Sequence, residues 1–100
     1  MVKHIILWKL KDEYSPERKA EIKAGIKEGL EGLKGRIQGL TDIRVVTCGL
    51  TSSNADVMLD STFESEEALK AYAVNPEHVA VADTKVRPFT AQRTCLDFEE

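Results

Sequence analysis

Apolar and polar positions alternate from the start of the chain. Over residues 2–10, every second side chain belongs to a mostly apolar set, namely Val2, His4, Ile6, Trp8 and Leu10. A period of two predicts a β-strand. The opposite face also carries the large apolar side chains of Ile5 and Leu7, so we expect both faces of this strand to be covered.

The next segment follows a helical period. Ser15 and Pro16 form a helix start, because Ser is a good N-cap and Pro fits the first turn. Apolar residues then recur at spacings of four, four and three, at Ile22, Ile26, Leu30 and Leu33. We expect the helix to end at Gly35. Three glycines beside the apolar stripe predict the close approach of another backbone: Gly25, Gly29 and Gly32.

Three more strands and a broken helix complete the pattern. The strands are expected at residues 41–49, 56–64 and 89–98. Ser65 caps a second helix, which Asn75-Pro76 interrupts and restarts, because Asn caps a helix and Pro belongs in its first turn. The order β-α-β-β-α-β predicts an α+β fold, the ferredoxin-like arrangement with an antiparallel four-stranded sheet. Residues 1–100 are expected to form one domain.

Helices on one side of such a sheet leave its other face bare. Ile5 and Leu7 would then meet water, together with apolar residues of the later strands. Pairing of two such faces removes this exposure, so we expect a homodimer formed through the sheet face.

Composition narrows the possible partners. The net charge is −3 and no basic stripe carries interleaved aromatics, so no nucleic acid is expected as a partner. No apolar run approaches about 18 residues, so no membrane span is expected. Cys48 and Cys95 lie far apart and are expected to be reduced, buried thiols of a cytoplasmic protein. Without clustered histidines or cysteines, neither a metal site nor a cofactor is expected.

Two histidines, His4 and His78, carry the candidate acid–base chemistry near neutral pH. His78 lies near a helix N-terminus, whose dipole disfavours the imidazolium form. A neutral imidazole beside the phenol of Tyr72 could abstract a proton alpha to a ketone, while Tyr72 stabilises the enolate. The structural alternative is that His78 caps a helix turn and Tyr72 is a core aromatic. For His4, we expect a core histidine with one hydrogen-bond partner.

The chain resembles the stress-responsive A/B barrel (Dabb) domains, members of the dimeric α+β barrel group. The resemblance rests on residues 2–11, 62–65, 69–72, 75–79 and 96–98, taken in that order. It implies a small barrel-forming dimer of stress-related or uncharacterised role. A smaller branch resembles polyketide cyclases, which need neither a metal nor an organic cofactor.

In cyclase-like members, a His–Tyr pair performs acid–base work in a pocket between helices and sheet. The matching catalytic candidates here are His78 and Tyr72. The resemblance implies a small apolar or aromatic ligand, with substrate-binding positions at His4, Ile6, Trp8, Val57 and Leu59. Asn75 and Val57 stand where such members carry further histidines. The alternatives are therefore a binding protein and a cofactor-independent cyclase or isomerase.

Overall fold

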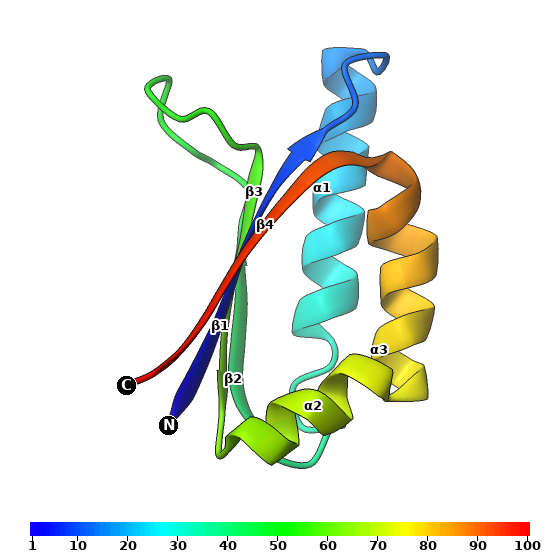
Figure 1. Cartoon of the computed structure of the whole chain (residues 1–100). Coiled ribbons are helices and arrows are strands. Elements are labelled where there is room, and N and C mark those ends of the chain that lie inside the picture. Colours follow the sequence, from blue (N-terminus) through cyan, green and yellow to red (C-terminus); the bar gives the residue numbers. More distant parts are fainter.

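An antiparallel four-stranded sheet with helices on one face forms the protein (Figure 1). The structure is a computed structural model that describes residues 1–100. Its strands are β1 (Val2–Leu10), β2 (Leu40–Val46), β3 (Val57–Phe63) and β4 (Thr90–Glu99). They lie in the order β2-β3-β1-β4, and each neighbouring pair is antiparallel. The predicted ferredoxin-like α+β fold is confirmed.

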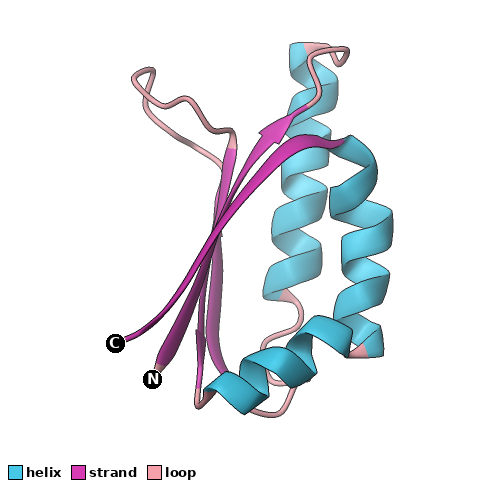
Figure 2. Ribbon diagram, in the orientation of Figure 1, coloured by secondary structure: helices cyan, strands magenta, loops and turns pink.

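All helical segments pack on the same face of this sheet (Figure 2). They are α1 (Pro16–Glu31), α2 (Glu66–Val74) and α3 (Pro76–Val81), followed by a π-helical turn (Ala82–Val86) and a 3₁₀ turn (Arg87–Phe89). The three expected N-caps form: Ser15 Oγ and Ser65 Oγ each accept a backbone N–H at 3.1 Å, and Asn75 Oδ1 accepts one at 2.9 Å. Asn75 is both the C-cap of α2 and the N-cap of α3, which fixes the bend between the two helices.

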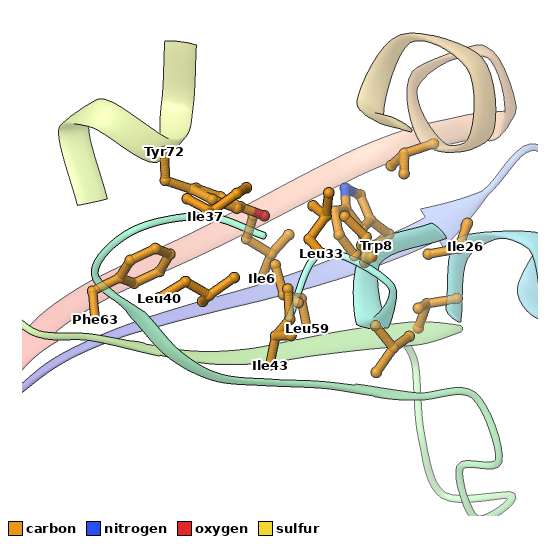
Figure 3. Packing of buried hydrophobic residues seen from close by; sticks show 14 of the residues in the cluster. Ile6, Trp8, Ile26, Leu33, Ile37, Leu40, Ile43, Leu59, Phe63 and Tyr72 are labelled. Carbon is orange, nitrogen blue, oxygen red and sulfur yellow. The ribbon is translucent and has the colours of Figure 1, made fainter. Parts of the chain in front are cut away.

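The core lies between the inner sheet face and the helices (Figure 3). The inner face of β1 is buried, as its period of two predicts. The same alternation buries β3 at Val57, Leu59, Ser61 and Phe63. From α1, Ile22, Ile26 and Leu30 pack onto these strands. Each fully buried aliphatic or aromatic side chain contributes about 1.5–3 kcal/mol of transfer free energy, so this layer supplies most of the stability.

Several expected boundaries and environments are wrong. Helix α1 ends at Glu31 with Gly32 as its cap, and Gly35 lies in the following turn with a φ of +82°. A glycine-rich segment gains little by extending a helix, because each glycine costs about 1 kcal/mol relative to Ala. Strand β2 ends at Val46, three residues early. The cysteines, expected to be buried, are both exposed, because one follows the end of β2 and the other lies on the edge strand β4.

The glycine stripe on α1 does mark a close approach, but the approaching groups are side chains. A Cβ at Gly29 would lie 2.9 Å from a methyl carbon of Val81, and one at Gly25 would touch the Lys85 stem at 3.8 Å. These contacts let α3 and the turn after it pack tightly against α1. The expected approach of another backbone at this position is therefore wrong.

The outer face of the sheet has no cover within one chain. Leu7, Leu96 and Phe98 are 41%, 64% and 40% exposed, and the register places Leu96 beside Ile5 on this face. A polar stripe crosses the same face, where the Lys3 ammonium lies 2.6 Å from Asp60. No helix in the chain has the length and apolar character needed to span a membrane.

Candidate functional site

A cavity of about 170 Å³ lies between the inner sheet face and the helices α2 and α3. Six of the seven residues expected at the site line it, namely His4, Ile6, Trp8, Leu59, Tyr72 and His78. The seventh, Val57, does not reach the cavity and is a core residue, 2% exposed. Val57 and Leu59 are neighbouring inner-face residues of β3, but only Leu59 lines the cavity.

The bend at Asn75 brings the Tyr72 and His78 rings together. Tyr72 lies near the end of α2, and His78 lies in the first turn of α3. Their ring centroids are 4.0 Å apart with planes inclined by 30°. Phe63 packs against the other side of Tyr72 at 4.9 Å, and the His4 ring lies 6.2 Å from it. The predicted His–Tyr pair therefore exists as a stacked pair on the cavity wall.

Both members of this pair bury a polar atom that has no hydrogen-bond partner. Neither Tyr72 Oη nor His78 Nδ1 has a hydrogen-bond partner of good geometry, although the backbone carbonyl groups of Ala73 and Tyr72 lie near the His78 ring. The similarly buried Asp60 Oδ1, by contrast, faces the Lys3 ammonium at 2.6 Å. A buried polar group without a partner costs about 1–3 kcal/mol. The two unpaired groups thus belong to residues that line this cavity, where a ligand could supply the missing hydrogen bonds.

Burial sets the protonation of this pair. It raises the pKa of the Tyr72 phenol, which therefore stays a donor at neutral pH. Burial also lowers the pKa of His78, and the positive charge of Arg87 adds to that effect, while the carbonyl groups of Ala73 and Tyr72 oppose it. The neutral imidazole expected from the sequence is therefore supported, but desolvation is its first cause.

His4 is a core histidine with a polar partner, as expected, and Cys95 Sγ lies 3.8 Å from the same ring nitrogen, Nδ1. Its Nδ1 contacts Oδ1 of Asp97, which lies directly opposite on β4. The backbone carbonyl of His4 accepts a hydrogen bond from Ser61 Oγ at 2.8 Å. In a neutral ring, donation from Nδ1 to Asp97 leaves Nε2 as an acceptor. The sequence could not identify this partner, because it does not reveal the register between the first and last strands.

Two arginines at the cavity were missed by sequence reasoning. Arg87 and Arg93 both line it, and no carboxylate does. Arg87 is paired with Asp83, whereas Arg93 forms no ion pair. A second cleft of about 560 Å³ adjoins the cavity and shares His4, Leu69, Ala73 and Arg93 with it. The cavity wall is therefore positively charged, and it opens toward a larger groove.

Comparison with known proteins gives a family. The family model of the Stress responsive A/B Barrel Domain matches residues 2–100. A dimeric protein of unknown function with a ferredoxin-like fold, from Bacteroides fragilis, is 32% identical with a TM-score of 0.92, and the match covers 99% of this chain and 95% of that one. No curated protein sequence matches this chain.

More distant structures share the fold. An Arabidopsis thaliana protein is 25% identical with a TM-score of 0.75, and the match covers 100% of this chain and 95% of that one. The hydroxynitrile lyase of Passiflora edulis is 17% identical with a TM-score of 0.72, over 97% of this chain and 90% of the lyase. At that identity the likeness shows the fold alone. From the family model and the Bacteroides relative, the chain belongs to the stress-responsive A/B barrel (Dabb) domain family.

Proposed function

We propose that this protein binds a small carbonyl compound in the cavity beside Tyr72 and His78. The observation that carries the proposal is the pair of buried, unpaired polar atoms, Tyr72 Oη and His78 Nδ1, on residues that line a hollow. Ligand sites combine a largely apolar wall with a few polar groups that fix orientation. A carbonyl oxygen would give Tyr72 the acceptor that it lacks.

The size of the cavity restricts the ligand. Its volume of about 170 Å³ is close to that of the roughly 150 Å³ engineered cavity that holds benzene. A ligand of about six to ten non-hydrogen atoms therefore fits. A polyketide chain would have to extend into the neighbouring cleft past His4 and Arg93. The geometry thus favours a small ketone over the longer substrates of the cyclase-like branch.

The chemistry that this arrangement supports is enolisation. His78, held neutral by burial, takes the proton from the carbon next to the carbonyl group, and the C–H electron pair moves into the enolate. The protonated Tyr72 donates to the enolate oxygen where negative charge develops. Return of the proton to a different carbon would complete an isomerisation, and no cofactor takes part in these steps.

Arg93 should favour a negatively charged ligand. It lines the cavity without a carboxylate partner, so a ligand that carries its own carboxylate would gain an ion pair there. Arginine and a carboxylate form strong, often bidentate hydrogen bonds. We therefore expect a 2-keto acid such as pyruvate to bind more tightly than a neutral ketone of similar size.

Exchange of alpha protons for deuterium, followed by NMR, tests enolisation directly. Cyclohexanone and pyruvate are incubated in D₂O with the wild type, with His78→Gln and with Cys48→Ser. We expect the wild type and Cys48→Ser to accelerate exchange equally, and His78→Gln to lose about 10²–10⁴-fold of that acceleration. Wild-type exchange no faster than in buffer would remove the enolisation proposal.

Arg93→Gln tests the charge preference, with the exposed Arg36 as the matched control position. Arg93→Gln should weaken pyruvate binding at least about tenfold and leave cyclohexanone binding unchanged. Arg36→Gln should change neither. Equal loss for both ketones in Arg93→Gln would mean that Arg93 only supports the wall.

The outer sheet face supports a homodimer, and the dimer itself is the second candidate role. Leu7, Leu96 and Phe98 are exposed in the single chain, and the 32% identical Bacteroides protein is described as dimeric. Covering these apolar side chains with a second copy removes them from water and so stabilises the dimer. A stress-related role and a cytoplasmic location stay predictions from the sequence.

Sedimentation at micromolar concentration tests the dimer. The wild type should sediment as a dimer and Leu96→Asp as a monomer. Leu50→Asp is the matched control, because Leu50 is 81% exposed in the loop between β2 and β3. A monomeric wild type would exclude this interface.

A further inference from the structure

Three potential metal ligands meet where β1 and β4 pair, one from the start of the chain and two from its last strand. His4 Nδ1, Cys95 Sγ and Asp97 Oδ1 all lie within 4.8 Å of one another. We propose that these three side chains bind a zinc ion, or a divalent ion of similar softness. Imidazole, thiolate and carboxylate are the protein ligands of zinc.

The pairing of the two strands fixes the positions of these ligands. Asp97 lies opposite His4, and Cys95 lies opposite the next inner-face residue of β1, Ile6. Side chains two residues apart on a strand point to the same face, so Cys95 and Asp97 both point to the side of His4. Ligands on two hydrogen-bonded strands are held more precisely than ligands on loops.

The distances between the ligand atoms suit a tetrahedral ion. Cys95 Sγ lies 3.8 Å from His4 Nδ1 and 3.4 Å from Asp97 Oδ1. With zinc–sulfur bonds near 2.3 Å and zinc–nitrogen or zinc–oxygen bonds near 2.0 Å, tetrahedral ligand atoms are separated by about 3.5 Å. Only the direct contact between His4 Nδ1 and Asp97 Oδ1 has to open to this spacing. The exposed side chain of Asp97 can make that movement.

The same geometry argues against a nucleophilic cysteine. In a catalytic triad the nucleophile and the carboxylate contact different nitrogens of the histidine. Here Cys95 and Asp97 both approach Nδ1 of His4. A metal ion would replace the thiol proton and the proton shared at Nδ1.

Charge and access are compatible with a bound ion. A neutral imidazole, one thiolate and one carboxylate balance the charge of a divalent cation. His4 and Asp97 line the cleft of about 560 Å³, so a fourth position could hold water or a ligand from that cleft. Arg93, two residues before Cys95, lines the same cleft, and its positive charge opposes the cation. The sequence alone predicts no metal site, because the three ligands meet only through strand pairing.

Cobalt(II) titration of the reduced, full-length protein tests the site. We expect one equivalent of cobalt to bind and to produce a thiolate-to-cobalt charge-transfer band, which zinc then displaces. Cys95→Ser should abolish this band and weaken zinc binding at least about tenfold, and Asp97→Asn should also weaken binding at least about tenfold. Cys48→Ser, at the other exposed cysteine, should leave the band and the affinity unchanged.

Each other outcome overturns the proposal. It fails if the wild type does not saturate with cobalt or zinc at micromolar concentration, if Cys95→Ser keeps the band or the wild-type affinity for zinc, or if Cys48→Ser loses the band. Far-ultraviolet circular dichroism verifies that Cys95→Ser is folded, and Asp97→Asn, at an exposed side chain, provides an independent variant. His78→Gln should retain metal binding, so failure of the metal site is distinguishable from failure of the ketone site.

Discussion

The two halves of the inner sheet face differ in how completely they are filled. Under α1, the aliphatic side chains of Ile22 and Ile26 are 3% and 0% exposed and belong to the packed core. Under α2 and α3, the cavity leaves Tyr72 Oη and His78 Nδ1 without partners. A single small core can thus combine a filled half that provides stability with a hollow half that is available for binding.

The bend between α2 and α3 explains why the hollow lies where it does. Helix α2 crosses the lower end of the sheet, while α3 runs alongside α1 (Figure 1). Small residues line the space that this turn leaves, including Ala73 and Ala82. In one continuous helix the Tyr72 and His78 rings could not stack, because residues six apart on a helix do not face each other.

Truncation in the filled half should have the largest effect. Ile26→Ala should lower the free energy of unfolding by about 2–5 kcal/mol, because it opens a cavity in a packed core. Leu69→Ala, at a half-buried residue on the hollow side, should cost no more than about 1–2 kcal/mol. Urea unfolding measures both. Equal costs would mean that the two halves are equally packed.

Removal of the Tyr72 hydroxyl should separate stability from binding. Tyr72→Phe deletes a buried, unpaired donor, so it should raise the free energy of unfolding by about 1 kcal/mol. The same change should weaken binding of cyclohexanone, which loses its donor. Tyr14→Phe serves as the control, because Tyr14 packs on Phe89 away from the cavity. Destabilisation by Tyr72→Phe would show that the hydroxyl has a structural partner.

The sequence predicted the fold better than the site. Periodicity located every strand, and Ser15, Ser65 and Asn75 marked the helix starts, because these signals are local. The pairing of His4 with Asp97 and the position of Arg93 depend on the register between the first and last strands, which local patterns do not reveal. Val57 was predicted to bind the substrate but lies in the core. Alternation along the strand predicts that Val57 is buried, but whether it reaches the cavity depends on where the helices pack.

Removal of the Asn75 cap tests whether ligand binding in the cavity depends on the bend between α2 and α3. Asn75→Ala removes the hydrogen bond to the Glu77 N–H and should cost about 1 kcal/mol, and it should also weaken ketone binding by loosening the stack. Ser15→Ala removes the corresponding cap of α1 and should cost a similar amount. Isothermal titration should find ketone binding unchanged in Ser15→Ala. If both variants bind equally well, the bend does not control the site.

Acidification should have the smallest effect, confined to the hollow half. His78 has a lowered pKa in the folded protein and an ordinary value near 6.5 when unfolded. Above about pH 6.5 His78 is neutral in both the folded and the unfolded state, so protonation takes nothing from the free energy of unfolding. As the pH falls, the unfolded chain takes up the proton first, and stability is lost until folded His78 is also protonated.

Unfolding curves between pH 7.5 and 5.5 measure this slope. His78→Gln should flatten it, whereas the carboxyl of Glu31, whose pKa is lowered chiefly by its hydrogen bond with Lys27, acts only at more acidic pH. Identical slopes in the wild type and His78→Gln would contradict the burial of a neutral His78.

An NMR titration of the ¹⁵N-labelled protein with cyclohexanone tests the central claim that the hollow half is a ligand site. Binding in the hollow half predicts saturable shifts of backbone amides around the cavity, at Ile6, Ala73 and His78, with none at Ile22 or Ile26. It also predicts weaker saturation in Tyr72→Phe. The absence of saturable shifts, or shifts centred on the packed residues of α1, would contradict the account.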